Sequence, residues 1–169
     1  MQPRLSMSGV ILAGGRSTCR RAVIESLARL MSSLFDETLV IANDKKNFAP
    51  WDLKDTVVYG DLFKNNGPLA GLYTALAYAK YPRCCVISCD MSMIDGSVLL
   101  DLAESDQEEY DALCLEDNNG CPQPFPGIYS RASRFLIRLL IERREYSMQR
   151  YMQVAVVKPV ALANKPSLI

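Results

Sequence analysis

The 169-residue sequence contains no histidine. This absence excludes a Ser-His-Asp triad, a Cys-His dyad and any zinc site built on imidazole ligands. Proton transfer, if the chain needs it, falls to aspartate, glutamate, lysine or tyrosine. Metal binding falls to carboxylates, which favour Mg²⁺. The composition therefore directs attention to carboxylates and backbone groups.

A charge excess and a long apolar run are also missing. Nineteen Lys and Arg residues balance nineteen Asp and Glu residues, so we expect neither nucleic acid nor a membrane as partner. No apolar stretch approaches 18 residues, and residues 1–9 lack the apolar core of a signal peptide. With 49% hydrophobic and 22% charged residues, the sequence predicts a single globular domain over residues 1–169, located in the cytoplasm.

Cysteine spacing gives no metal or redox motif. The six cysteines form no C-x-x-C pair, and Cys84, Cys85 and Cys89 lie in an apolar run. Cysteine in such a run is usually a small buried hydrophobe. We therefore expect these three side chains to be buried rather than bonded to sulfur or metal, and Cys85 to be chemically inert.

Short apolar runs alternate with helical patterns along the chain. Apolar runs that lack alternation and are joined through helices predict a mostly parallel sheet covered on both faces, an α/β fold of Rossmann-like type. The stretch 111–129 has no intervening helix, so we expect a mixed sheet with at least one antiparallel strand. The predicted strands are 9–13, 38–42, 56–59, 83–88, 111–115, 126–129 and 154–157, and the predicted helices are 21–34, 67–80, 97–104, 135–142 and 147–152.

Polar or glycine residues follow each of the first four predicted strands. In order they are Gly14-Gly15, Asn43, Asp61 and Asp90. Ligands of open α/β sheets bind at this edge, and glycines let backbone N–H groups approach a phosphate. Each residue also has a plain structural interpretation, as a turn, a loop start or a turn cap. A functional role is indicated most strongly for Asp90, because an unpaired carboxylate directly after a buried run lowers the stability of the fold.

Three segments stand in an order and spacing that is typical of one family: Leu12-Ala-Gly-Gly-Arg-Ser17, Gly67-Pro-Leu-Ala-Gly71 and Ser88-Cys-Asp-Met91. They resemble the molybdenum cofactor guanylyltransferases. Gln123-Pro124 and the segment Ala163-Asn164-Lys165-Pro166 are similar to two further motifs of that family. The resemblance covers about residues 8–168, and the Leu-Ala-Gly-Gly and Gly-Pro-Leu-Ala-Gly motifs favour guanylyl over cytidylyl relatives.

The resemblance implies a three-layer fold of the nucleotide-diphospho-sugar transferase type. It also implies transfer of GMP from GTP to the molybdopterin cofactor, with Mg²⁺, release of pyrophosphate and transient contact with molybdoenzyme maturation proteins. The implied catalytic residues are Gly15, Arg16 and Asp90, with Asp90 also the metal ligand. The implied binding residues are Leu12, Ala13 and Gly14 for GTP, Asn43 and Asp61 for its nucleoside, and Gln123 and Asn164 for the pterin.

One departure from the family pattern follows the glycine loop. The family continues with a segment that carries a phosphate-neutralising lysine, whereas here Arg20 runs directly into a helix that begins at Arg21. Either the natural protein has a mobile loop that this sequence omits, or the protein lacks the loop and is a weak or inactive paralogue. Arg16, Arg20 and Arg21 are the nearby cations. The intact mass of the natural chain separates these explanations, since 18.9 kDa corresponds to the shorter form.

Two other functions remain open at this point. One is a related transferase, either a cytidylyltransferase for molybdopterin or a guanylyltransferase for phospholactate. The other is a nucleotide- or cofactor-binding adaptor that has kept the sheet edge and lost catalysis. Comparing pyrophosphate release from GTP and CTP separates the related transferases.

Overall fold

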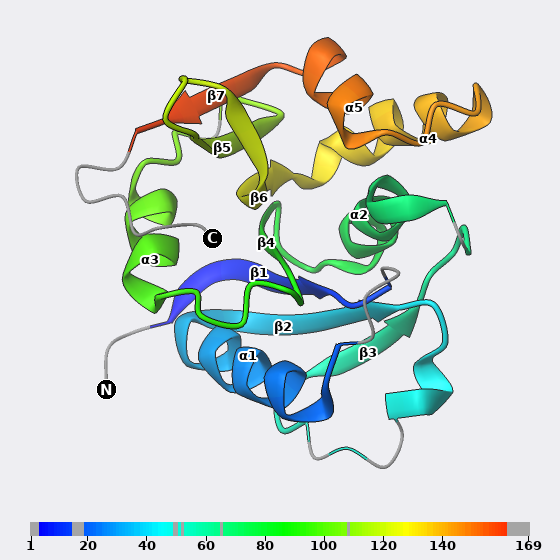
Figure 1. Cartoon of the computed structure of the whole chain (residues 1–169), viewed down its shortest axis with the longest axis vertical. Coiled ribbons are helices and arrows are strands. Elements are labelled where there is room, and N and C mark those ends of the chain that lie inside the picture. Colours follow the sequence, from blue (N-terminus) through cyan, green and yellow to red (C-terminus); the bar gives the residue numbers. More distant parts are fainter. Residues whose placement is uncertain are drawn as a thin grey trace.

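The computed structural model describes residues 4–14, 19–48, 51, 53–64, 66–107 and 109–161. These residues form one seven-stranded sheet in the order β3-β2-β1-β4-β6-β5-β7 (Figure 1). The strands are β1 Leu5–Leu12, β2 Phe35–Ala42, β3 Val57–Gly60, β4 Arg83–Ser88, β5 Ala112–Glu116, β6 Pro122–Ser130 and β7 Val157–Val160. The helices are α1 Arg21–Leu34, α2 Gly67–Tyr78, α3 Gly96–Glu104, α4 Arg134–Glu142 and α5 Met148–Val154, with short 3₁₀ helices η1 Lys45–Phe48 and η2 Arg131–Ser133.

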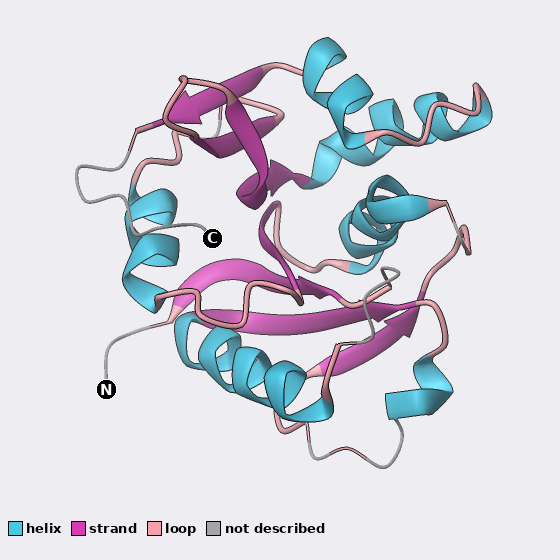
Figure 2. Ribbon diagram, viewed as in Figure 1, coloured by secondary structure: helices cyan, strands magenta, loops and turns pink. Residues whose placement is uncertain are grey.

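The sheet is mixed, as the sequence predicts. β1 pairs in parallel with β2 on one side and with β4 on the other, and β3 continues the parallel half beyond β2. β6 is the exception, because it runs antiparallel to both β4 and β5, while β7 is parallel to β5 (Figure 2). The mostly parallel, Rossmann-like α/β architecture is therefore confirmed.

Two apolar clusters cover the two faces of the sheet. Successive residues of β1 belong to opposite clusters, with Val10 packed on one face and Ile11 on the other. This two-sided burial explains why the strand reads as a continuous apolar run. One cluster includes residues of α2, α4 and α5, and the other includes residues of α1 and α3.

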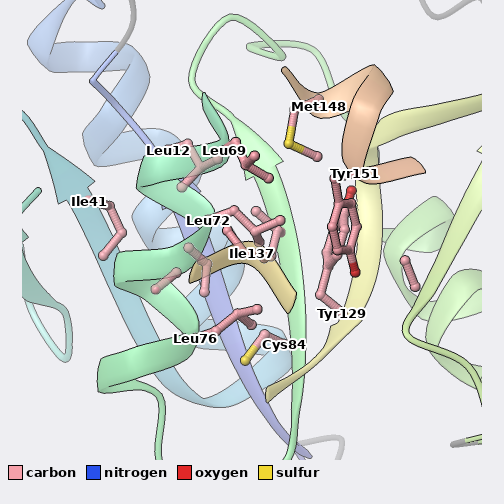
Figure 3. Close-up of a cluster of buried hydrophobic side chains, with 14 of the residues drawn as sticks. Leu12, Ile41, Leu69, Leu72, Leu76, Cys84, Tyr129, Ile137, Met148 and Tyr151 are labelled. Carbon is pink, nitrogen blue, oxygen red and sulfur yellow. The ribbon is translucent and has the colours of Figure 1, made fainter. Parts of the chain in front are cut away.

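The cluster beneath α2 contains two fully buried tyrosines. Leu69, Leu72 and Leu76 of α2 lie against the strands, and Tyr129 of β6 lies beside Tyr151 of α5 (Figure 3). Their ring centroids are 6.1 Å apart and the rings are tilted by 42°. This arrangement is within the range of favourable aromatic pairs, so it joins the antiparallel half of the sheet to the last helix.

A buried ion pair fixes the start of β4. The Arg83 guanidinium donates two hydrogen bonds to the Asp106 carboxylate, at 2.6 and 2.5 Å, and a third to the carbonyl of Tyr110 at 2.8 Å. Both side chains are buried, at 4% and 1% exposure. Bidentate geometry with a further carbonyl acceptor is what allows such a pair to be buried.

Several element boundaries differ from the sequence-based predictions. β6 begins four residues earlier than predicted, because Pro122 already pairs with Glu116 across the turn. β7 begins at Val157 rather than Val154, because Val154 completes α5. A short apolar run fits a helix end as well as a strand, so periodicity alone does not place this boundary.

The prediction for the cysteines is right for two residues and wrong for one. Cys84 and Cys85 are fully buried free thiols, and burial raises the pKa of Cys84 to about 12 and that of Cys85 further. Cys89 is also buried, but it forms a disulfide with Cys19. The two cysteines are 70 residues apart in sequence, and only the pairing of β1 with β4 brings them together.

Among the helices in the described part of the chain, none is long and apolar enough to cross a membrane.

Gly127 in β6 lies where no side chain fits, and this predicts a large effect of substitution. A Cβ atom at Gly127 would lie 2.9 Å from the carbonyl oxygen of Pro124 and 2.9 Å from the ring of Tyr129. Gly127→Ala should lower the free energy of unfolding by about 1–3 kcal/mol through overpacking. Urea denaturation measures this loss.

Gly60, which has nothing within 4 Å of its added Cβ, supplies the matched control. Gly60→Ala should leave stability unchanged or slightly raised. Equal stability of the Gly127→Ala and Gly60→Ala proteins would contradict the packing described for β6.

Candidate functional site at the carboxyl edge of the sheet

Parallel pairing gathers the ends of the first four strands at one edge of the sheet. β1, β2, β3 and β4 share a direction, so the residues that follow them lie along this edge. The hydrogen bonds that connect these segments support this placement. The N–H of Asp61 donates to the carbonyl of Ala42 at 2.8 Å, and the N–H of Cys89 donates to that of Leu12 at 3.1 Å.

Asn43 holds the start of the glycine segment, the name used here for residues 13–16, which follow β1. Its Nδ2 donates to the carbonyl of Gly14 at 2.7 Å, and the N–H of Ala13 donates to the carbonyl of Ile41 at 2.7 Å. A Cβ on Gly14 would lie 3.3 Å from Oδ1 of Asn43, tighter than an ordinary contact. The glycine thus permits the close approach of the two segments. Gly15 and Arg16 lie outside the described residues.

Asp61 is buried at 8% exposure and serves a structural role in the fold. Its Oδ1 accepts from the N–H of Phe63 at 3.1 Å and from the hydroxyl of Thr74 at 2.8 Å. Thr74 in turn accepts from the N–H of Leu62 at 3.0 Å, so this pair shapes the segment between β3 and α2. Asp61 therefore caps the turn after β3, and its contact with a nucleotide stays a prediction.

The environment of Asp61 favours its neutral form. Burial raises the pKa of its carboxyl above the ordinary 3.8, and the hydrogen bonds from Phe63 and Thr74 offset part of that rise. The other oxygen, Oδ2, would be 3.9 Å from a Cβ placed on Gly71 of α2. This distance is an ordinary van der Waals contact, so Gly71 is not required to avoid a clash with the carboxyl of Asp61.

Asp90 lies in the turn after β4 and is exposed. The expectation that it lies near the core is wrong, because the chain leaves the sheet at Ser88 and turns, with the N–H of Met91 donating to the carbonyl of Ser88 at 3.1 Å. Within the described part of the chain, no hydrogen bond or ion pair engages its carboxylate. Because the carboxylate is exposed, it imposes no burial cost on the fold.

The antiparallel hairpin extends the same edge toward β7. Gln123 lies near the start of β6, and its Nε2 donates to the Asp117 carboxylate at 3.2 Å. Asp117 also accepts from the N–H groups of Asn119 and Cys121, at 2.8 and 2.9 Å, which closes the turn between β5 and β6. Gln123 is thus held beside the turn, whereas Asn164 lies outside the described residues.

Sequence reasoning missed Thr74 and Asp117. A lone threonine within the apolar segment Leu69–Ala77 was the available signal for the first, and an aspartate directly before Asn-Asn-Gly was the signal for the second. The spacing of the cysteines in the sequence did not indicate that Cys19 pairs with Cys89.

Residues 9–158 match the family described as the MobA-like NTP transferase domain. A relative from Clostridium perfringens, named a probable molybdenum cofactor guanylyltransferase, is 28% identical over 77% of this chain and 69% of its own length. One of the same name from Pelotomaculum thermopropionicum is 30% identical over 75% of this chain and 65% of its own. The chain thus spans about two thirds of the length of these relatives.

Solved structures share the fold. A putative protein of Aquifex aeolicus has a TM-score of 0.78 at 24% identity, covering 93% of this chain and 87% of its own. Molybdopterin-guanine dinucleotide biosynthesis protein A from Archaeoglobus fulgidus has a TM-score of 0.74 at 21% identity, covering 92% and 83%. These likenesses establish a common fold with nucleotidyltransferases.

The raised pKa of Asp61 predicts a pH dependence of stability. Because the folded carboxyl holds its proton to higher pH than the unfolded one, the folded state binds more protons just above pH 3.8, and stability falls as pH rises through that window. Asparagine retains the oxygen that accepts from Phe63 and Thr74. Asp61→Asn should therefore equal or exceed the parent in thermal stability at pH 7 and lose this advantage below pH 4.

Asp44→Asn is the matched control, because exposed Asp44 also accepts a backbone N–H two residues ahead, from Lys46. Marked destabilisation of Asp61→Asn at pH 7, with Asp44→Asn unaffected, would show that the charged form is what the hydrogen bonds require.

Proposed function

The chain belongs to the family of MobA-like NTP transferase domains, a family of nucleotidyltransferases, and from this we propose that it transfers GMP from GTP to the molybdopterin cofactor. The observation that supports the proposal most directly is the gathering of Gly14, Asn43 and Asp90 at one edge of the sheet. These are positions at which the sequence resembles the guanylyltransferases. We further propose that the reaction takes place in the cytoplasm.

The proposed chemistry needs no histidine. A phosphate oxygen of molybdopterin attacks the α-phosphorus of GTP and forms a new P–O bond. The bond from that phosphorus to the bridging oxygen of the β-phosphate breaks, and pyrophosphate leaves with the electron pair. The nucleophile is already anionic, so positioning and neutralisation of charge are the main requirements.

The candidate residues would meet these requirements in different ways. Backbone N–H groups of the glycine segment, Gly15 included, would receive the charge that develops on the phosphates, and Arg16 is the nearest cation in sequence. Asn43 would keep this segment in place through its bond to Gly14. Leu12, Ala13 and Asp61 would line the nucleotide side, and Gln123 and Asn164 the pterin side.

The donor set fits Mg²⁺. In the described part of the chain no three carboxylate, cysteine or histidine side chains gather into a metal cluster, but Asp90 is exposed at the edge. Mg²⁺ is commonly held by one or two carboxylates together with substrate phosphates and water. Bound there, it would neutralise phosphate charge, with Asp90 as its protein ligand.

Nucleotide choice is the first test of the proposal. We expect GTP to bind more tightly than CTP or ATP in the presence of Mg²⁺, because hydrogen-bonding groups in a site discriminate strongly against a base that leaves them unpaired. Titration calorimetry measures the three affinities, and pyrophosphate release with molybdopterin measures turnover.

CTP binding equal to or tighter than GTP binding would move the assignment to a cytidylyltransferase. Tight GTP binding without pyrophosphate release would identify a nucleotide-binding protein that has lost catalysis along with the family's lysine segment.

Asp90→Asn is the second test. The substitution keeps size and removes charge, so loss of a charge-assisted ligand should weaken binding of Mg-GTP by about 1.5–3 kcal/mol. Turnover should fall further, because charge neutralisation acts mainly on the transition state. Folding should be unchanged, since the side chain is exposed.

Asp101→Asn is the control, because Asp101 is an exposed carboxylate of the neighbouring helix α3. If Asp90→Asn and Asp101→Asn both behaved like the parent, the metal assignment would be wrong. If Asp90→Asn failed to fold, the carboxylate would be structural.

A further inference from the structure

One oxygen of the Asp61 carboxyl is used by the fold, and the other is not. Oδ1 accepts from the N–H of Phe63 and from the hydroxyl of Thr74, whereas no hydrogen bond or ion pair among the described residues reaches Oδ2. Among the buried side-chain oxygens and nitrogens of those residues, the hydroxyl of Tyr151 alone lacks both a partner and solvent contact. Oδ2, which also has no partner, is therefore in contact with solvent.

The surroundings of Oδ2 are apolar. A Cβ atom placed on Gly71 of α2 would lie 3.9 Å from Oδ2, 3.5 Å from the side chain of Leu12 and 3.9 Å from that of Ile41. Leu12 and Ile41 lie beside α2 near the ends of β1 and β2 (Figure 3). Oδ2 is thus a solitary polar atom at the carboxyl edge of the sheet, with uncharged side chains around it.

Thr74 fixes the orientation of this carboxyl. Its side chain is fully buried in α2, and its oxygen accepts from the N–H of Leu62 at 3.0 Å. The hydroxyl proton can go to Oδ1 of Asp61 at 2.8 Å or to the carbonyl of Ala70 at 3.1 Å. A carboxylate is the stronger acceptor, so the proton is directed to Oδ1. This bond keeps Oδ1 turned toward the helix and leaves Oδ2 on the open side.

The two donors on Oδ1 also determine where the carboxyl carries a proton. The N–H of Phe63 can only donate, so Oδ1 remains an acceptor in both protonation states and the proton of the neutral acid is on Oδ2. Burial raises the pKa of Asp61 and the hydrogen bond from Thr74 lowers it, with no charged neighbour among the causes. Thr74 therefore widens the pH range in which Oδ2 is an acceptor.

We propose that Thr74 is a positioning residue of the nucleotide site, which holds the Asp61 carboxyl so that Oδ2 accepts a hydrogen bond from the ligand. The ligand group must then be an N–H or O–H donor, which a nucleotide offers on its base and on its ribose. A phosphate oxygen is disfavoured there by its negative charge. The identity of the ligand rests on the function proposed above, whereas the hold of Thr74 on the carboxyl does not.

The first measurement needs no ligand. Carbon NMR of the whole chain, labelled at the aspartate carboxyls, follows the titration of Asp61. Thr74→Val removes the donor and should move this titration to higher pH, and Thr74→Ser should restore it. Thr38→Val is the matched control, because Thr38 is another buried threonine whose hydroxyl accepts from Ser32 at 3.3 Å, and it should leave Asp61 unchanged.

The second measurement is calorimetry with Mg-GTP at pH 7. Thr74→Val should weaken binding by about three- to tenfold, the effect of one hydrogen bond, with Thr74→Ser and Thr38→Val close to the parent. Asp61→Asn keeps the oxygen that faces Thr74 and presents an amide donor in place of Oδ2, so it should weaken binding at least as much. Thr74→Val should cause no further loss in the Asp61→Asn protein, because it acts through this carboxyl.

Two analogues distinguish the sources of the donor. If the difference between the parent and Thr74→Val disappears with 2′-deoxy-GTP, the ribose hydroxyl is the donor. If it disappears with inosine triphosphate, which lacks the 2-amino group of guanine, the base is the donor.

An Asp61 titration that is the same in Thr74→Val and the parent would overturn the proposal. Parent-like GTP binding by Asp61→Asn would overturn it as well, and that result stands even if Thr74→Val does not fold. If the titration shifts as expected but the parent itself binds no GTP, the proposed function is wrong and the hold of Thr74 on the carboxyl remains.

Discussion

The parallel pairing of β1 with both β2 and β4 is the constraint on which the rest of the site depends. Because all three strands run the same way, Leu12, Ala42 and Ser88 end at one edge, and the segments after them meet there. The pairing also brings Cys89 to the end of β1, where its N–H donates to the carbonyl of Leu12. Without this register, the polar residues after the strands would be unrelated points on the surface.

Two of the polar side chains at this edge, those of Asn43 and Asp61, form hydrogen bonds within the fold, whereas that of Asp90 is exposed. Asn43 donates to Gly14, and Asp61 accepts from Phe63 and Thr74, so each of these side chains already shapes a segment. Asp90 lies in the exposed turn after β4. This division is physically sensible, because a binding edge needs segments held in fixed positions as well as a charge free to meet a ligand.

The antiparallel strand β6 widens the same edge. It returns alongside β4 and places its first residues next to the end of β5, where Asp117 closes the turn and accepts from Gln123. The buried pair of Tyr129 and Tyr151 anchors this half of the sheet to α5. In the proposed site, the nucleotide side would lie along the ends of the parallel strands and the acceptor side at the start of β6, where Gln123 lies.

The sequence by itself determined the strands and helices, the mixed sheet and the residues that follow each strand, because continuous apolar runs, helical spacing and breaker residues are local signals. It also contained the family motifs. Tertiary structure alone decided that Asp90 is exposed, that Asp61 is bonded to Thr74 and that Cys89 meets Cys19. These facts depend on how the chain leaves a strand and on which strands become neighbours. No local pattern encodes a contact between residues 70 positions apart, since it arises only when the strands pair.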